Sequence, residues 1–318
     1  MAILHINRES GIPLMGSLSF GIVDKGSQML EIKPNTGCNI NCIFCSVDEG
    51  SCSKKTMDIV IEKNYLVEEI RKILEFKKHT MDIFINPHGE PLLYEDVVEL
   101  VADLRKFGYV RDIVIITNGT LLSEKVDRLI EAGLTGLNIS LNTLHEKKAV
   151  ELAEAPYNVD RIKEIIDKVK DKVKITLAPV LMKNINENDI EELVKYCKEH
   201  NLEIGIQNFL KNSRGRNPTK QISMKKFYKV LEDLEEKHQI KLIKEEKIEK
   251  TKTLPKPFRR GQVIDALLVC RGRYDDESYA IAQNRIITIK KKFTHRKPVK
   301  IKLIRDSFNI YNGKEIKK

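Results

Sequence analysis

Short β-type apolar runs alternate along the chain with longer stretches in which apolar residues recur every three or four positions. The expected strands are residues 29–32, 81–85, 112–116, 136–141, 174–177 and 203–206, and the expected helices are 59–77, 94–107, 123–132, 159–170, 186–199 and 223–238. Strands separated by helices of ten or more residues pair in parallel through right-handed crossovers. The pattern therefore predicts an α/β fold with about six strand–helix units, which suits a partial barrel better than a closed eight-unit one.

The two ends of the chain follow other patterns. Glycines and Pro13 interrupt residues 1–27, where we expect a hairpin or an irregular lead-in. Prolines on both sides of Lys256 make a stiff connector, so a domain boundary is expected there. Beyond it, strand-like runs at 262–270, 278–282, 285–290, 299–304 and 308–311 predict a small OB-like β-barrel. The expected organisation is a lead-in (1–27), a core (28–253) and a basic β-barrel (254–318).

The positive charge is concentrated in the expected barrel. The 318 residues carry a formal net charge of +10, with 56 Lys or Arg and 46 Asp or Glu. Residues 254–318 hold 17 of the basic and 6 of the acidic residues, so their net charge is about +11 and the rest of the chain is nearly neutral. This distribution favours a polyanionic partner, nucleic acid before membrane, although a charge run is often only a solvated face.

With no apolar run of membrane-spanning length and no secretion signal, we expect a cytoplasmic protein without a membrane partner.

Four of the six cysteines lie within fifteen residues, at positions 38, 42, 45 and 52. In a cytosolic protein such a cluster binds metal more often than it forms disulfides. Three thiolates on one short loop can hold three irons of a cubane cluster, which leaves the fourth iron open to a cofactor. A zinc knuckle that adds Cys52 is the alternative, but zinc ligands usually come as two separated pairs.

The motif Cys38-Asn39-Ile40-Asn41-Cys42-Ile43-Phe44-Cys45 resembles the cluster-binding loop of the radical S-adenosylmethionine (SAM) superfamily. The resemblance implies a [4Fe–4S] cluster bound by Cys38, Cys42 and Cys45, with Phe44 beside the cofactor. In that family the open iron binds SAM, and an electron from the cluster breaks a C–S bond to give methionine and a 5′-deoxyadenosyl radical. A small electron donor such as ferredoxin or flavodoxin is then an expected partner.

A second segment, Asn86-Pro87-His88-Gly89-Glu90-Pro91, follows the second expected strand. It resembles the Gly-Gly-Glu-Pro segment of the family, which implies that Gly89, Glu90 and Pro91 hold the SAM ammonium group. His88 stands in place of the first glycine. It is either a proton donor facing the substrate or an ordinary loop histidine.

Weaker matches follow the later strands. Active sites of α/β barrels form at the carboxyl ends of the strands, and the resemblance implies SAM contacts at five such positions: Asn118, Ser140, Asn142, Pro179 and Gln207. Polar residues also end strands in proteins that lack any such site. These five positions are therefore hypotheses that depend on the fold.

The basic segment 254–318 resembles the TRAM domain, an OB-like RNA-binding module. Its cations, beside Tyr274, Tyr279 and Phe293, suit phosphate contacts and base stacking. The expected RNA-binding residues are Arg271, Arg273, Arg285, Lys291, Lys292 and Arg296.

The whole chain, including the run Cys45-Ser46-Val47-Asp48, is similar to an uncharacterised archaeal branch of the superfamily without an assigned reaction. We therefore expect a radical SAM enzyme that modifies a nucleoside in RNA, with tRNA as the first candidate. Two alternatives stay open. The same chemistry would act on a protein, a peptide or a small metabolite, or the chain would be a non-enzymatic RNA-binding protein with a structural metal.

Overall fold

The protein forms two compact units, neither of which is continuous in sequence. The structure is a computed structural model that describes residues 2–244 and 247–316. Unit 1 comprises Met1–Gly37, Lys54–Ile113 and Ile248–Lys318, and unit 2 comprises Cys38–Ser53 and Val114–Lys247. That a separate domain begins at residue 254 remains a prediction.

The largest sheet has seven strands in the order β10-β8-β7-β6-β5-β3-β2. Their bounds are β2 (Gly21–Asp24), β3 (Met29–Lys33), β5 (Met81–Ile85), β6 (Val110–Thr117), β7 (Gly136–Ile139), β8 (Lys174–Leu177) and β10 (Glu203–Ile204). The pairs β3–β5, β6–β7, β7–β8 and β8–β10 are parallel, whereas β2 joins β3 in an antiparallel pair. The expected α/β class with parallel pairing is confirmed.

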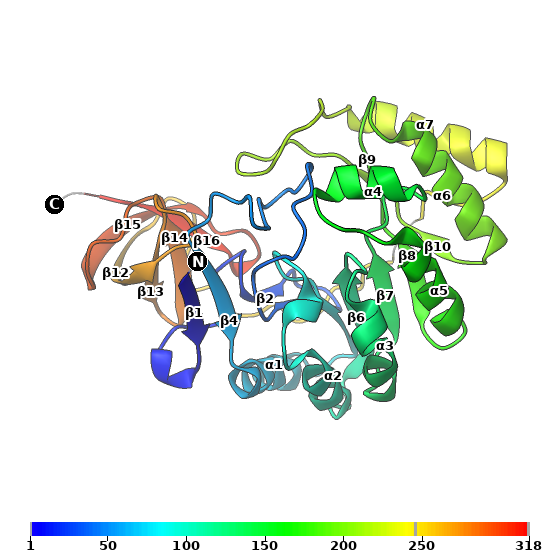
Figure 1. The fold of residues 1–318 in the computed structure, drawn as a ribbon. Coiled ribbons are helices and arrows are strands. Elements are labelled where there is room, and N and C mark those ends of the chain that lie inside the picture. The colour runs from blue at the N-terminus through cyan, green and yellow to red at the C-terminus, as the bar shows by residue number, and fades with distance from the viewer. Residues whose placement is uncertain (1, 245–246, 317–318) are drawn as a thin grey trace. The chain divides into compact units, whose positions relative to one another are not determined.

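Helices separate the parallel strands. Unit 1 contains α1 (Lys63–Lys77) and α2 (Val97–Arg105), which lie side by side (Figure 1). Unit 2 contains α3 (Leu122–Glu131), α4 (Glu146–Ala153), α5 (Val159–Val169), α6 (Glu187–Glu199) and α7 (Met224–His238). The longer helices each bury one apolar stripe, such as Leu66, Ile70 and Ile73 on α1. None of the helices in the described parts of the chain is long and apolar enough to cross a bilayer.

The expected helix at 59–77 is wrong over its first residues. Met57–Ile61 is instead a strand, β4, which pairs in parallel with β1 (Ala2–Ile6). Ile59 and Ile61 are fully buried, and the β-branched side chains of this run suit a strand. The partner strand lies more than fifty residues away in sequence, so local periodicity does not reveal it. The lead-in is correspondingly not a hairpin, because β1 pairs with β4.

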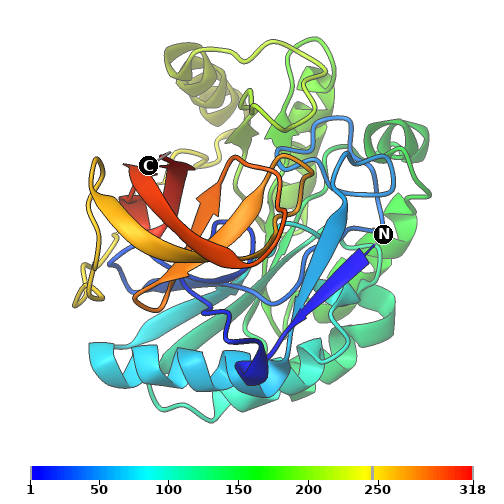
Figure 2. The same ribbon diagram turned by 90° about the vertical axis from the view of Figure 1, so that its left-hand side faces the viewer.

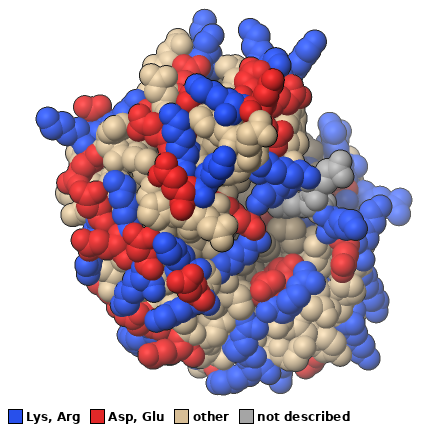
Figure 3. Space-filling model, turned by 90° about the vertical axis from the view of Figure 1, so that its right-hand side faces the viewer, with Lys and Arg blue, Asp and Glu red and all other residues tan. Residues whose placement is uncertain are grey.

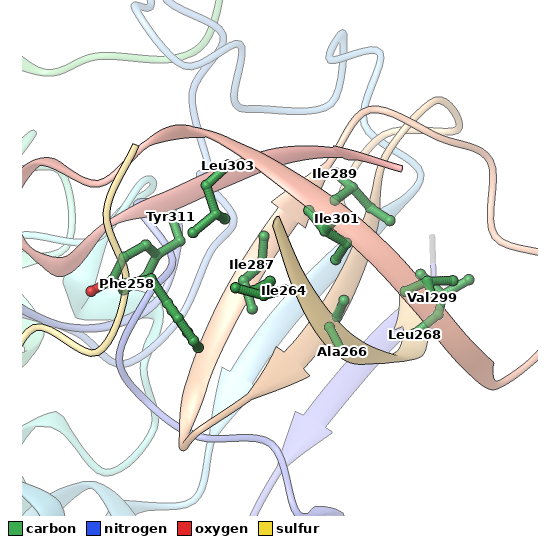
Figure 4. Packing of buried hydrophobic residues seen from close by; sticks show 11 residues of the cluster. Phe258, Ile264, Ala266, Leu268, Ile287, Ile289, Val299, Ile301, Leu303 and Tyr311 are labelled. Atoms are coloured by element: carbon green, nitrogen blue, oxygen red, sulfur yellow. The ribbon is translucent and has the colours of Figure 1, made fainter. Parts of the chain in front are cut away.

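Five strands at the end of the chain close into the expected barrel. They are β12 (Val263–Arg271), β13 (Ser278–Ala282), β14 (Arg285–Ile289), β15 (Lys297–Arg305) and β16 (Tyr311–Glu315), in the order β12-β13-β14-β16-β15 (Figure 2). The last strand begins three residues later than expected, because the left-handed backbone of Phe308 and Asn309 (φ +55° and +57°) forms a turn before it. Alternate residues point inward, as Figure 4 shows for Ile264, Ala266 and Leu268 of β12.

The lead-in packs on the barrel within unit 1. The backbone N–H of Ile286 donates to the Met15 carbonyl (2.8 Å), and that of Tyr311 donates to the Gly16 carbonyl (2.9 Å). A Cβ atom at Gly16 would lie 2.2 Å from the Ile286 carbonyl oxygen, so only glycine permits this approach. The edge of one aromatic ring also meets the face of the other where Phe20 contacts Tyr279.

Candidate active site

The Gly-Glu-Pro segment of unit 1 is held against the turn that precedes the cysteine motif. A Cβ atom at Gly89 would lie 1.8 Å from the Gly37 carbonyl oxygen, so no side chain fits there. The backbone N–H of Glu90 donates to the same oxygen (2.8 Å), and the side chain of Asn35 donates to the Glu90 carbonyl (3.1 Å). The Glu90 carboxylate is buried and accepts from the Leu92 N–H (3.0 Å). Pro91 opens the 3₁₀ turn Pro91–Leu93, which completes a rigid segment.

Strand β4 supports the other side of this contact. The Thr36 hydroxyl donates to Asp58 (2.9 Å), and the buried Lys55 ammonium donates to the same carboxylate oxygen (2.6 Å). The Thr36 N–H donates to the Ile59 carbonyl (2.8 Å). Gly37 follows at φ +107°, a conformation that favours glycine. The strand that the sequence failed to predict therefore positions the turn that leads into the cysteine motif.

His88 contacts an arginine of the barrel. Arg273 Nη1 lies 3.2 Å from His88 Nδ1. Because a guanidinium only donates, Nδ1 accepts and the ring proton is on Nε2. Burial, reinforced by the Lys33 ammonium, lowers the pKa of His88 to about 3. The ring is therefore neutral at physiological pH, with an N–H donor on Nε2.

The expectation that Arg273 and Arg285 bind RNA is wrong, because their side chains are packed inside unit 1. Arg273 is 2% exposed, and its carbonyl accepts from the Thr56 N–H (2.7 Å). Arg285 is 8% exposed and donates to the Pro255 carbonyl (2.9 Å). Neither guanidinium belongs to the outer surface of the barrel.

The aromatic residues expected to stack on bases are covered as well. Tyr274 and Tyr279 are buried, and Phe293 packs against the barrel core. Phe308 is instead the exposed aromatic residue of the barrel, with half of its surface accessible. Of the remaining expected cations, Arg271, Lys292 and Arg296 are exposed, whereas Lys291 is half-buried and paired with Glu315.

The three motif cysteines of unit 2 are thiols outside any disulfide, on the loop Cys38–Ser53. Burial, and the neighbouring thiols of Cys38 and Cys45, raise the pKa of Cys42. Thiolates this close repel one another, and bound metal cations would remove that repulsion. Asn118 Nδ2 lies 3.8 Å from Cys38 Sγ, and the Glu49 N–H donates to Cys45 Sγ (3.2 Å). Such donors suit the thiolate ligands of an iron–sulfur cluster.

The three thiols are not arranged like the ligands of a single metal ion. Among the described residues, no three Cys, His, Asp or Glu side chains converge on one point as ligands of one ion. A cubane cluster takes each of three thiolates on a different iron, so its ligands do not need to converge. Cys52 is exposed on the same loop. In their donor chemistry, three thiols on one loop with hydrogen-bond donors at two of the sulfurs fit the cluster.

Helix α4, which the sequence did not predict, anchors the cysteine loop. The N–H groups of Asn41 and Ile43 donate to the carbonyls of Ala153 (2.7 Å) and Leu152 (3.0 Å) at the end of that helix. Phe44 is half-buried against the apolar cluster that contains Leu152. The loop is thus fixed on both sides of Cys42.

The expected SAM-contacting residues of unit 2 form a connected series at the strand ends. The Asn118 side chain donates to the side-chain oxygen of Asn39 (3.0 Å), which links it to the cysteine loop. The Tyr157 hydroxyl lies within hydrogen-bonding distance of the Asn118 carbonyl (2.6 Å) and the Ser140 carbonyl (3.5 Å). Tyr157 is buried and was missed by the sequence reasoning, because it follows a helix rather than a strand.

The series continues across the next strand ends. Asn142 Nδ2 donates to the Ser140 carbonyl (3.0 Å), and Asn142 Oδ1 accepts from the Val180 N–H (2.8 Å). The Gln207 N–H donates to the Pro179 carbonyl (2.8 Å), where β9 (Val180–Leu181) pairs in parallel with β11 (Gln207–Asn208). The structure therefore brings all five expected residues of unit 2 to neighbouring strand ends.

Comparison with known proteins decides the family. The family model of the radical SAM superfamily matches residues 32–197. The chain belongs to the radical SAM superfamily. It is 33% identical to the uncharacterized protein MJ0103 of Methanocaldococcus jannaschii, across 96% of this chain and 79% of that protein. The resemblance seen in the sequence is confirmed: the protein is a radical SAM enzyme, and its cofactors are a [4Fe–4S] cluster and SAM.

Other relatives match less of their length. A GTP 3′,8-cyclase of Listeria welshimeri is 29% identical over 55% of this chain and 52% of its own, so the chain spans about half of that relative. Among solved structures, Streptococcus suis SuiB bound to S-adenosylmethionine has a TM-score of 0.54 at 20% identity, covering 73% of this chain and 50% of SuiB. The SuiB match concerns the fold of the radical SAM superfamily.

Proposed function

We propose that the protein binds its [4Fe–4S] cluster through Cys38, Cys42 and Cys45 and modifies a nucleoside in RNA, with tRNA as the first candidate. The cluster and SAM, when bound, supply a 5′-deoxyadenosyl radical that abstracts a hydrogen atom. The residues of the chain bind and orient these groups. A small reductant such as ferredoxin or flavodoxin would supply the electron.

The contacts within each unit support the assignment of the cofactor-binding residues. In unit 2, hydrogen-bond donors reach the sulfurs of Cys38 and Cys45, and Phe44 is packed beside Cys45 on the same loop. In unit 1, Gly89, Glu90 and Pro91 form a rigid segment that we assign to the SAM ammonium group. The neutral His88 is assigned as a donor through Nε2, held in that tautomer by Arg273.

The observation that carries the RNA proposal is a set of exposed cations on the barrel without acidic partners. Within the described residues, no acidic side chain pairs with Arg259, Arg271, Lys292, Arg296, Lys302 or Lys314. The helices of unit 2 differ: Lys163, Lys168 and Lys170 each pair with an aspartate. The face in Figure 3 likewise shows the two charges intermixed. Unpaired cations are available to phosphates.

The exposed aromatic ring of Phe308 adds a second contact type. It lies in the loop between β15 and β16, the fourth and fifth strands of the barrel. In OB-type barrels the loop between these strands contributes to oligonucleotide binding. Base–aromatic stacking contributes about 1–3 kcal/mol per base. These features favour a single-stranded or looped RNA segment.

Salt dependence of binding tests the RNA proposal directly. Replacing Arg271, Lys292 and Arg296 with Gln should reduce the slope of log affinity against log salt by about 2, since each phosphate contact on a single strand contributes about 0.7. Fluorescence anisotropy with a labelled tRNA measures the slope. The matched control replaces Lys163, Lys168 and Lys170 with Gln and should leave it unchanged. An equal slope in the wild-type protein and the barrel variant would contradict the assigned surface.

Nucleoside mass spectrometry of RNA tests the reaction itself. RNA from cells without the gene should lack one modified nucleoside. The wild-type gene should restore it, whereas the Cys42→Ala gene should not. Identical nucleoside profiles with and without the gene would reject RNA as the substrate.

The relation to GTP 3′,8-cyclases favours one second candidate, a small purine nucleotide as the substrate. That relation covers 55% of this chain. Release of 5′-deoxyadenosine that GTP stimulates and RNA does not would support this candidate over the first.

A further inference from the structure

Arg216 contacts the cysteine loop although 168 residues separate it from Asp48. It lies in unit 2 between β11 and α7, outside any helix or strand. Its Nη1 donates to the carbonyls of Asn41 (2.5 Å) and Cys42 (3.1 Å), and Nη2 donates to the Glu49 carbonyl (2.6 Å). Nε donates to the carboxylate of Asp48 (3.1 Å). One guanidinium therefore binds both the start and the end of the loop.

The backbone at Arg216 also contacts the cysteine loop. The Arg216 N–H donates to the Cys45 carbonyl (2.9 Å). A Cβ atom at Gly215 would lie 2.8 Å from the carbonyl oxygens of Cys45 and Ser46. Residues 215 and 216 thus lie directly against the loop, and the side chain of Arg216 is 19% exposed.

The ion pair with Arg216 explains how the run Cys45-Ser46-Val47-Asp48 keeps its conformation at Asp48. Asp48 is buried and has φ +53°, a left-handed conformation that is unfavourable for a residue other than glycine. Its carboxylate accepts from Arg216 and also from the Ser53 hydroxyl (3.4 Å). Such a conformation persists where surrounding contacts hold it. Here those contacts come from the ion pair and the serine.

The guanidinium also places a positive charge beside the loop that carries the cysteines. Its Nη1 lies 3.1 Å from the Cys42 carbonyl oxygen, and the Arg216 N–H lies 2.9 Å from the Cys45 carbonyl oxygen, so the charge is held beside both residues. A nearby cation favours the more negative state of any group, so it favours the reduced state of a cluster over the oxidised state. Without Arg216, the Asp48 carboxylate would in addition lose the hydrogen bond from Nε.

We propose that Arg216 is a positioning residue that fixes the carbonyls around Cys42 and raises the reduction potential of the cluster. The inference rests on the proposed assignment of Cys38, Cys42 and Cys45 as ligands. Arg216 touches neither substrate nor reacting atoms in this account. It acts through the loop and through its charge.

The test compares Arg216→Met and Arg216→Lys with the wild-type protein, all reconstituted anaerobically with iron and sulfide. Dithionite supplies the electron in a redox titration followed by electron paramagnetic resonance. At the midpoint potential of the wild-type cluster, Arg216→Met should hold about tenfold less reduced cluster relative to oxidised cluster, which is 59 mV for one electron. Arg216→Lys keeps the charge and should recover most of this ratio.

Limited proteolysis of the apo-proteins separates positioning from charge. Both variants should be cut faster within residues 38–53 than the wild-type protein, because lysine cannot reach all four acceptors at once. The matched control is Arg161→Met, which removes an exposed arginine paired with Glu164 and should change neither measurement.

The outcomes distinguish the two levels of the proposal. A wild-type protein that takes up no iron would reject the cluster ligands themselves. A wild-type protein that holds the cluster, together with an Arg216→Met protein of unchanged potential and unchanged proteolysis, would reject the role of Arg216 alone. If Arg216→Met does not fold, an Arg216→Lys protein with wild-type proteolysis would reject the positioning role.

Discussion

Gly89→Ala tests the contact between the Gly-Glu-Pro segment and the turn before the cysteines. The new Cβ atom would lie 1.8 Å from the Gly37 carbonyl oxygen and 2.4 Å from its carbon. Ordinary contact begins at 3.4 Å, so one of the two backbone segments must move by about 1.6 Å. Such a shift breaks the hydrogen bond from the Glu90 N–H to the same oxygen (2.8 Å).

The expected loss of stability follows from these two effects. Forcing an extra methyl group into a packed site costs about 1–3 kcal/mol, and a lost hydrogen bond costs about 1 kcal/mol. We therefore expect the free energy of unfolding to fall by about 3 kcal/mol. In a protein of this size that lowers the thermal midpoint by about 4–5 °C.

Circular dichroism of the apo-protein measures the midpoint, and iron content after reconstitution measures the effect on the loop that follows Gly37. Both should fall in Gly89→Ala. Gly108→Ala is the matched control, because nothing lies within 4 Å of its Cβ position and its φ is not positive. That change should be neutral or slightly stabilising. A Gly89→Ala protein with the midpoint and iron content of the wild-type protein would refute the reasoning.

Two further predictions concern the thiols and His88. Cys42→Ala should lose most of its iron after reconstitution, whereas Cys52→Ala, which changes an exposed thiol of the same loop, should keep it; full iron content in Cys42→Ala would contradict the ligand assignment. The pKa of His88 is about 3 in the folded protein and near 6.5 when unfolded, so between these values the unfolded state binds more protons and the free energy of unfolding rises with pH. Urea unfolding across this range should show a shallower rise in His88→Asn, and parallel curves for the two proteins would argue against a half-buried neutral ring.

The sequence predicted the parts of the fold that depend on local periodicity. Strands β5, β8 and β13 have the expected limits, because each is a short apolar run. Strand β4 was missed because its pairing with β1 is a tertiary contact. Helix α4 was missed because its two turns bury only Ala149, Leu152 and Ala153, too few to show a periodic stripe.

The candidate site divides in the same way. The cysteine spacing and the Gly-Glu-Pro segment are local motifs, so the sequence could predict both. The contact between Arg273 and His88 joins residues 185 positions apart, and nothing in the charge run distinguishes a buried arginine from an exposed one. Arg216 was missed for the same reason, since its acceptors are mostly backbone carbonyls, which a side-chain pattern does not reveal.

Reductive cleavage of SAM tests the central claim most directly. The wild-type protein, reconstituted anaerobically and reduced with dithionite, should release 5′-deoxyadenosine and methionine in equal amounts, and Cys38→Ala, Cys42→Ala and Cys45→Ala should release neither. A fully reconstituted wild-type protein that leaves SAM intact, or a Cys42→Ala protein that cleaves it at the wild-type rate, would contradict the account.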